Sequence, residues 1–236
     1  GLRVAVLAQP DWHDAEAFRA MGRPRLGVFI GAGNLDSMVA HYTAAKRRRS
    51  EDFYSPGKRT GCRPDRAAIV YCNRAREAFG PDVPIILGSL EASLRRFAHY
   101  DYWDDSVRRA ILFDAPADLL VYGMGEAATI EIAHRLKKKQ SVHTMTDIPG
   151  TGYITRDPAE CKFEHITLPS YEDVRDNKRL YAEATRTEYA EHDPVRGRAM
   201  IQPCEGRYLV INPPAMPLDT KELDRVADLP YTREWH

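Results

Sequence analysis

The 236-residue sequence lacks three features that would assign it to a membrane or to a nucleic-acid partner at once. It has no apolar run near the roughly 20 residues that span a bilayer, and from its first residues we expect no secretory leader. It also lacks net charge, because 34 basic residues are balanced by 34 acidic ones. A neutral chain feels no general attraction to nucleic acid or to an anionic membrane. We therefore expect a cytoplasmic protein without a membrane partner.

The sequence also lacks any recognisable cysteine motif. Cys62, Cys72, Cys161 and Cys204 are scattered along the chain, with no CxxC pair and no CxxxCxxC run. Metal and iron–sulfur sites usually draw on cysteines at such close spacing, so we expect no metal site within this chain. Free thiols in a reducing compartment are the better interpretation.

What the sequence does contain is an ordinary globular composition, with 43% hydrophobic and 29% charged residues. Its length suits one large domain, or one domain with an appendage. The chain opens with Gly1 directly before an apolar segment and closes at His236, soon after Pro230. We therefore expect it to be a piece of a longer protein.

Short apolar segments alternate with helical patterns over the first 150 residues. The segments 2–8, 26–31, 83–87 and 118–122 are apolar and rich in branched side chains, which is typical of buried strands. Helical patterns cover residues 14–21, 36–45, 64–79, 91–97, 104–113 and 126–139. Strands that alternate with helices predict an α/β fold built on a doubly wound parallel sheet.

The remaining residues have a different character and predict a C-terminal α+β extension. An edge strand is expected at residues 151–155, and Ser170 begins a charged helix that runs to about residue 191. A strand at 207–211 and a short helix at 219–227 follow. The predicted division is therefore an α/β domain at residues 1–150 and an extension at residues 151–236.

Glycine-containing turns follow three of the predicted strands. Where these strands give way to helices, the sequence places Asn34, Gly88, Ser89, Gly123, Gly125 and Glu126. In parallel sheets ligands collect at this edge, because glycine lets the backbone approach closely and helix amino ends favour polar or anionic groups. Glu126 is also simply favourable in a first helical turn. We take these residues as candidates for ligand binding.

The helix after Gly88 carries Glu91 and leads into a dense polar and aromatic stretch. Further candidate ligand-binding residues in and after this helix are Glu91, Arg95, Arg96, His99, Tyr100 and Asp101. A carboxylate at Asp101 beside two guanidinium groups would stay ionised, and it could hold the His99 imidazole in one tautomer. The stretch is either part of a ligand site or a well-packed, salt-bridged connection. No nucleophile constellation is legible, so the catalytic residues are unknown.

A basic, irregular segment at residues 46–66 supports an alternative. Lys46 to Arg49 and Arg59 to Arg66 alternate with aromatic side chains, a composition that can bind single-stranded nucleic acid. Acidic residues dilute this charge, so a solvated face or an active-site flap also fits.

Several motifs taken together resemble the YgiQ family of radical SAM proteins, from end to end and in the same order. The matching segments are QPDW (9–12), AGNLDSM (32–38), YTA (42–44), RPDRA (63–67), LGSLEASLRRFAHYDYWDDSVRR (87–109), ADLLVYGMGE (117–126), LPSYEDV (168–174) and INPPAMPL (211–218). Ser89-Leu90 stands where this family leads us to expect Gly-Ile.

The resemblance implies an accessory N-terminal domain of a radical SAM enzyme of unknown substrate. It implies a downstream radical SAM barrel of the same polypeptide, which would hold a 4Fe-4S cluster and S-adenosylmethionine. It also implies a Rossmann-like fold similar to cobalamin-binding domains, with cobalamin as a possible ligand. The alternative remains a nucleotide- or nucleic-acid-binding α/β module. In a third interpretation the domain is a scaffold, with Tyr100 and Trp103 at an interdomain contact.

Overall fold

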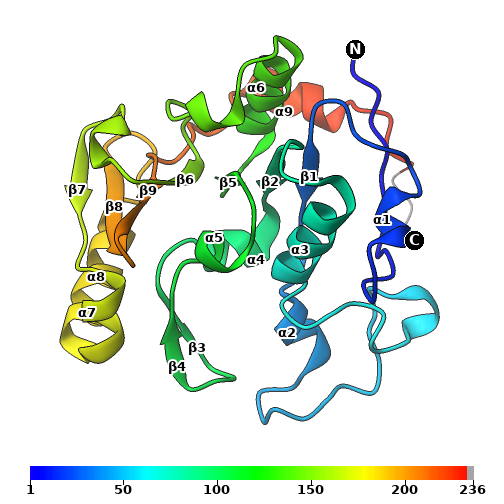
Figure 1. The fold of residues 1–236 in the computed structure, drawn as a ribbon, viewed down its shortest axis with the longest axis horizontal. Coiled ribbons are helices and arrows are strands. Elements are labelled where there is room, and N and C mark those ends of the chain that lie inside the picture. The colour runs from blue at the N-terminus through cyan, green and yellow to red at the C-terminus, as the bar shows by residue number, and fades with distance from the viewer. Residues whose placement is uncertain (233–236) are drawn as a thin grey trace.

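The computed structural model describes residues 1–232, which form a seven-stranded sheet with helices on both faces (Figure 1). In spatial order the strands are β1 (Val28–Ile30), β2 (Ile85–Leu87), β5 (Leu119–Val121), β6 (Thr151–Thr155), β9 (Arg207–Ile211), β8 (Ala199–Cys204) and β7 (His165–Thr167). The helices are α1 (Glu16–Arg19), α2 (Ser37–His41), α3 (Ala67–Phe79), α4 (Ser89–Leu94), α5 (Ile111–Asp114), α6 (Glu126–Lys137), α7 (Tyr171–Asp176), α8 (Lys178–Ala190) and α9 (Thr220–Ala227). Within residues 1–232, no helix combines the length and apolarity needed to cross a bilayer.

The predicted α/β class is confirmed, but the sheet is mixed rather than wholly parallel. β1, β2 and β5 are parallel neighbours, joined by helical crossovers as parallel strands require. β6 and β9 then add antiparallel strands, and β8 pairs with β9 through a two-residue turn at Glu205 and Gly206, both with positive φ. Such a turn suits a tight antiparallel hairpin. At the other edge of the sheet, β7 and β8 are again parallel. The expectation of parallel strands therefore holds for β1, β2 and β5 but not for the sheet as a whole.

The sheet runs without interruption across residue 150. Leu120 pairs with Gly152 and Val121 with Thr151, so β6 lies inside the sheet between β5 and β9. The expectation of an edge strand at residues 151–155 is therefore wrong. The division into residues 1–150 and 151–236 stays a prediction.

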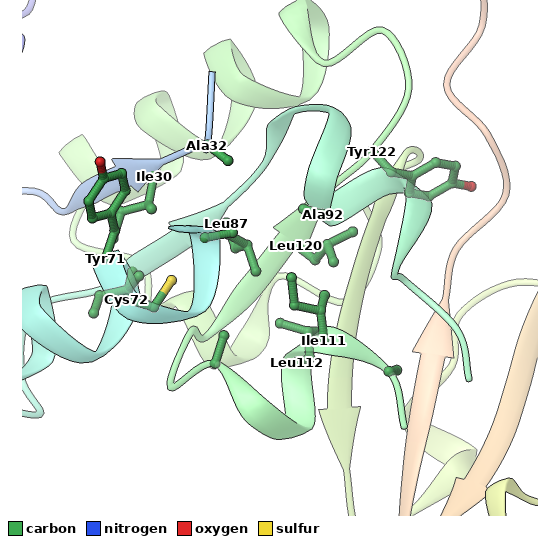
Figure 2. Close-up of a cluster of buried hydrophobic side chains, with 14 of the residues drawn as sticks. Ile30, Ala32, Tyr71, Cys72, Leu87, Ala92, Ile111, Leu112, Leu120 and Tyr122 are labelled. Carbon is green, nitrogen blue, oxygen red and sulfur yellow. The ribbon is translucent and has the colours of Figure 1, made fainter. Parts of the chain in front are cut away.

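Alternating side chains of the strands fill two cores on opposite faces of the sheet. Leu87 and Leu120 point into the core under α3, α4 and α5, whereas Ile86 and Leu119 point into the core under α6. Figure 2 shows the first core, in which Ala92 of α4 packs near Leu120. Successive strand residues face opposite sides of the sheet, and a core covers each side. These strands therefore need apolar residues at every position. That requirement explains the continuous apolar runs in the sequence.

A two-stranded hairpin projects from the body of the domain between α2 and the pair α7 and α8 (Figure 1). Its strands are β3 (His99–Asp101) and β4 (Ser106–Arg108), paired antiparallel. The predicted helix at residues 104–113 is helical only from Ile111, where α5 begins, because the chain turns at Asp105 with positive φ and returns along β3 as β4. The predicted single helix at residues 170–191 is also divided, since Asn177 ends α7 and caps α8.

The first predicted strand is not a strand. Residues 2–8 are exposed and unpaired, with Val4 and Val6 among the most exposed apolar side chains of the described residues. A branched apolar run forms a strand only where a sheet edge pairs with it, and within residues 1–232 the pairing partner of β1 is β2.

Candidate functional site

The carboxyl ends of β1, β2 and β5 lie side by side and bring the predicted glycine turns together. The Gly88 amide donates to the carbonyl of Ile30 at 2.8 Å. The Ala32 amide donates to the Ser89 hydroxyl at 3.1 Å, and the Gly123 amide lies 3.4 Å from the Ser93 hydroxyl. We call residues 31–34, 88–94 and 122–126 the carboxyl-edge rim. Its role in ligand binding stays a prediction.

Ser89 occupies a backbone conformation that favours glycine. Its φ is +70°, in the left-handed region that non-glycine residues rarely adopt. The position is the one where the family resemblance leads us to expect glycine. The Ser89 hydroxyl offsets part of the strain by accepting the hydrogen bond from Ala32. A side chain at Gly31 would lie 2.9 Å from Ser89, so this turn also needs glycine on the facing strand.

The outer surface of the rim is apolar as well as polar. Asn34, Ser89 and Glu126 are exposed, and Gly125 precedes the first residue of α6. Three large apolar side chains lie among them: Leu90 and Leu94, one turn apart on α4, and Met124 in the turn after β5. We call Leu90, Leu94 and Met124 the rim patch.

Glu91 is placed differently from the rest of the rim. Its side chain is fully buried, and its carboxylate accepts hydrogen bonds from the Ser37 amide at 3.1 Å, the Ser37 hydroxyl at 2.7 Å and the Ala68 amide at 3.1 Å. These donors belong to the amino ends of α2 and α3, where a negative charge is favourable. The contacts account for its burial, and contact with a ligand stays a prediction.

Arg95 contributes to the same junction from the other end of α4. Its guanidinium pairs with Asp36, and the Asp36 carboxylate caps α2 by accepting hydrogen bonds from the amides of Met38 and Val39. The N-cap of α2 is thus Asp36. Arg95 therefore ties α4 to α2.

Arg96 points instead toward the end of β5 and the segment after α8. Its guanidinium donates to the Ser93 carbonyl at 2.6 Å and to His192 Nδ1 at 3.1 Å, and it lies 4.9 Å from the centre of the Tyr122 ring. Burial lowers the pKa of Arg96. Burial also raises the pKa of Glu188, on α8, to about 7, although the charge of Arg96 opposes this shift.

Sequence reasoning missed three members of this cluster, Tyr122, Glu188 and His192. Tyr122 ends the predicted strand at residues 118–122. Glu188 and His192 lie about 90 residues further along the chain than Arg96, in or directly after the charged helix predicted from Ser170 to about residue 191. No local pattern in the sequence marks them.

His99, Tyr100 and Asp101 form strand β3 of the hairpin. His99 Nδ1 donates to the Phe97 carbonyl at 3.0 Å, so this carbonyl fixes the tautomer that we expected Asp101 to fix. Burial lowers the pKa of His99, and the nearby Arg95 charge lowers it further. His99 is therefore neutral at pH 7.

Asp101 pairs with an arginine from outside the stretch. Its carboxylate accepts a hydrogen bond from Arg66 at 2.7 Å and from the Trp103 amide at 2.8 Å. Burial would raise the pKa of Asp101, but the hydrogen bonds from Arg66 and Trp103 lower it overall. The expected ionised carboxylate is supported, and its contacts join the hairpin to the start of α3.

The tip of the hairpin packs on the chain after α2. The Trp103 ring lies 4.7 Å from the Tyr42 ring, and the Tyr102 hydroxyl donates to the Ala44 carbonyl at 2.7 Å. The Tyr100 hydroxyl donates to Asp105, within the hairpin. Apart from Arg96, which points toward the end of β5, the named side chains after α4 thus form a packed, salt-bridged connection.

The cysteines do not form a metal site in the described part of the chain. Burial raises the pKa of both the Cys72 and the Cys204 thiol to about 12, far from the thiolate form that binds metals. Among residues 1–232, no group of three or more histidine, cysteine or acidic side chains could hold a metal ion. The residues present therefore do not fit an iron–sulfur cluster.

The basic segment is irregular, as expected, and several of its cations are already engaged. Arg63 forms a buried ion pair with Asp52, and Lys46 lies 4.7 Å from the centre of the Tyr102 ring. An open groove of about 480 Å³ runs beside the segment and is lined in part by Arg48, Arg49, Phe53 and Tyr54.

Comparison with known proteins places the chain in a family. Over residues 1–236 it matches the family described as Radical SAM N-terminal. It is 50% identical over its 236 residues to a UPF0313 protein of Clostridium botulinum (strain 657 / Type Ba4), of which it covers 37%. It is 52% identical to a UPF0313 protein of Clostridium perfringens (strain SM101 / Type A), of which it covers 36%.

The chain thus spans little more than a third of the length of these relatives. No solved structure matches it significantly. The similarity along the full chain confirms the resemblance to the YgiQ family that the motifs indicated, and the chain belongs to the Radical SAM N-terminal family.

Proposed function

We propose that this chain is an accessory domain of a radical SAM enzyme and that its carboxyl-edge rim packs against the catalytic part of the same polypeptide. The observation that carries the proposal is the rim patch. Leu94 is 60% exposed and Met124 is 55% exposed, on the edge of the sheet where α/β proteins bind ligands. An exposed apolar patch beside polar groups is typical of an interaction surface.

The family supports the identity of the partner. Relatives continue for nearly two thirds of their length outside the matched region, and the family description names the chain as the N-terminal part of radical SAM proteins. The partner would be a radical SAM barrel carrying the 4Fe-4S cluster and S-adenosylmethionine. The substrate would lie between barrel and rim, in contact with residues of both.

A Rossmann-like interpretation of residues 1–150 is supported by β1, β2 and β5, which are parallel and have helices on both faces.

Cobalamin binding has less support than the Rossmann-like fold. The loop after β1, residues 31–36, contains no histidine, and His41 at the end of α2 is buried with its Nδ1 2.7 Å from Asp65. No residue of the described chain is therefore assigned to cobalamin.

Oxidative footprinting of the longer, natural protein tests the docking. Hydroxyl radicals oxidise methionine in proportion to its exposure, and Met21, 61% exposed and remote from the rim, is a matched control for Met124. We expect Met124 to oxidise several-fold more slowly than Met21. Equal rates of oxidation would show that nothing covers the rim.

The groove beside the basic segment favours a second candidate, a nucleic-acid-binding module. Phe53 and Tyr54 are exposed there next to Arg48 and Arg49, and bases stack on exposed rings while cations track the phosphates. The test is the salt dependence of RNA binding. Binding whose slope against salt falls by about 1 in the variant Arg48→Gln would support this candidate, and absence of binding at low salt would remove it.

A further inference from the structure

Arg96 has no acidic partner within ion-pair distance, unlike several other shielded arginines of the described chain. Arg63, Arg66, Arg76 and Arg95 each pair with an aspartate. Within residues 1–232, no carboxylate oxygen lies within 4.0 Å of the Arg96 guanidinium. A cation removed from water without a counter-charge is costly.

The groups that do contact Arg96 are neutral. The Ser93 carbonyl and His192 Nδ1 each accept one hydrogen bond from its terminal nitrogens, and the rings of Phe97 and Tyr122 flank the guanidinium at 5.2 Å and 4.9 Å. Its Nε is buried and has no hydrogen-bond partner. These contacts fix the guanidinium in place without supplying a negative charge. The acidic group whose charge acts on Arg96 is Glu188, from beyond ion-pair distance.

The titratable groups that face Arg96 are Tyr122, Glu188 and His192. The Tyr122 hydroxyl donates to the Asn212 carbonyl, and burial raises the pKa of Tyr122, so it stays neutral. Burial and the charge of Arg96 lower the pKa of His192, so it is also neutral at pH 7. Only Glu188, with a pKa that burial raises to about 7, changes its charge near neutral pH.

We propose that Arg96 binds one anionic group of the ligand, a carboxylate or a phosphate, at the end of β5 beside Gly123. A guanidinium binds either group strongly, with paired hydrogen bonds. Ser93 connects the two features, since its carbonyl accepts from Arg96 while its hydroxyl lies 3.4 Å from the Gly123 amide. The inference rests on the proposed role of the rim, and it adds the chemical class of the ligand.

Glu188 makes the site dependent on pH. Below about pH 7 the Glu188 carboxyl is protonated and neutral. The Arg96 guanidinium can then bind an external anion without competition from Glu188. Above that pH its carboxylate competes with the anion for Arg96. Anion binding should therefore weaken as the pH rises through 7.

The test is equilibrium dialysis of the full-length protein against labelled sulfate and, separately, labelled acetate, with ionic strength held constant by chloride. Both probes keep the same charge between pH 6 and 8. We expect one bound anion per chain at pH 6, and at least tenfold weaker binding in Arg96→Gln. The control variant Arg175→Gln removes an exposed arginine of α7 that pairs with its neighbour Asp176, and it should bind as the wild type does.

A second variant, Glu188→Gln, is expected to gain anion binding, and misfolding would not produce such a gain. Glu188→Gln should bind the anion more tightly than the wild type at pH 8 and equally at pH 6. Tighter sulfate than acetate binding would indicate a phosphate ligand, and the reverse order a carboxylate ligand. Three outcomes would overturn the proposal: no anion bound by the wild type at 20 mM, equal binding by Arg96→Gln, or weaker binding by Glu188→Gln at pH 8. None of them depends on whether Met124 is covered, so the docking proposal is tested separately.

Discussion

The Glu91 carboxylate lies 2.7 Å from the Ser37 hydroxyl, where the amino ends of α2, α3 and α4 meet. The Ser37 hydroxyl in turn accepts a hydrogen bond from the Ala67 amide at 3.0 Å. One buried carboxylate thus satisfies donors of two helices from within the first turn of the third. Because α4 begins at the rim, this junction also sets the position of the rim.

Replacing Glu91 by glutamine should strongly destabilise the protein. The amide group would turn one donor toward the Ser37 and Ala68 donors, and the negative charge at the helix amino ends would be lost. We expect the free energy of unfolding to fall by about 2–4 kcal/mol, measured by urea unfolding. The exposed first-turn residue Glu126 is the control, and Glu126→Gln should have a much smaller effect. Equal effects of the two substitutions would contradict the structural role of Glu91.

Ser89 allows backbone strain to be separated from a hydrogen bond. Ser89→Gly removes the strain of the positive φ and also the hydroxyl that binds the Ala32 amide, and these effects should nearly cancel. Ser89→Ala removes the hydroxyl and keeps the strain. We therefore expect the alanine variant to be less stable than the glycine variant by about 1 kcal/mol, measured by thermal unfolding. An alanine variant as stable as the glycine variant would show that the left-handed conformation costs nothing here.

The ion pair of Asp52 with Arg63 should hold the basic segment together. Both side chains are almost fully buried, and two terminal-nitrogen contacts of 2.7 and 2.8 Å join them. Asp52→Asn leaves a buried guanidinium without its counter-charge, so we expect a local loss of about 3–5 kcal/mol. Proteolysis within residues 46–66 should accelerate accordingly. The control variant Asp176→Asn breaks an exposed pair with Arg175 and should leave the rate of cleavage unchanged. An unchanged rate in Asp52→Asn would show that the pair of Asp52 with Arg63 does not stabilise the segment.

Glu188 should make stability fall as the pH rises toward 7. Its pKa is about 7 in the folded protein against an ordinary value of 4.5. Between these values the folded state holds a proton that the unfolded chain has released, so the free energy of unfolding decreases with increasing pH. Glu188→Gln removes this titration and should be more stable than the wild type at pH 8 by on the order of 2–3 kcal/mol.

The comparison at pH 4 provides the internal check on Glu188. There the carboxyl is mostly protonated in both states, and the wild type and Glu188→Gln should unfold at nearly the same urea concentration. Glu183→Gln, on the same helix with its carboxylate paired to Arg179 at the surface, should leave the pH profile unchanged. A difference between wild type and Glu188→Gln that is constant from pH 4 to pH 8 would rule out the shifted titration.

Where a sequence pattern reflects local physics, it predicted the structure well. The apolar runs at residues 26–31, 83–87 and 118–122 contain β1, β2 and β5, because strands covered on both faces need apolar side chains throughout. The glycine turns after β2 and β5 also lie together as expected, since parallel neighbours end at the same edge of a sheet.

Patterns whose outcome depends on a pairing partner were misinterpreted. Residues 2–8 have the composition of a strand but pair with no described strand. Residues 104–113 have helical composition, yet β4 forms because β3 offers it a ladder. In both cases the outcome depends on which other segment is adjacent, and composition does not report that.

The sequence alone determined the α/β class, the parallel arrangement of β1, β2 and β5, the glycine turns and the family, because each depends on residues close together in the chain or on motifs of the chain itself. Only the tertiary structure decided that Arg95 and Asp101 are paired within the fold while Arg96 lacks an acidic partner among residues 1–232. The reason is physical: the charge balance of a buried side chain is set by groups that the fold brings near it, and His192 and Glu188 reach Arg96 from about 90 residues away.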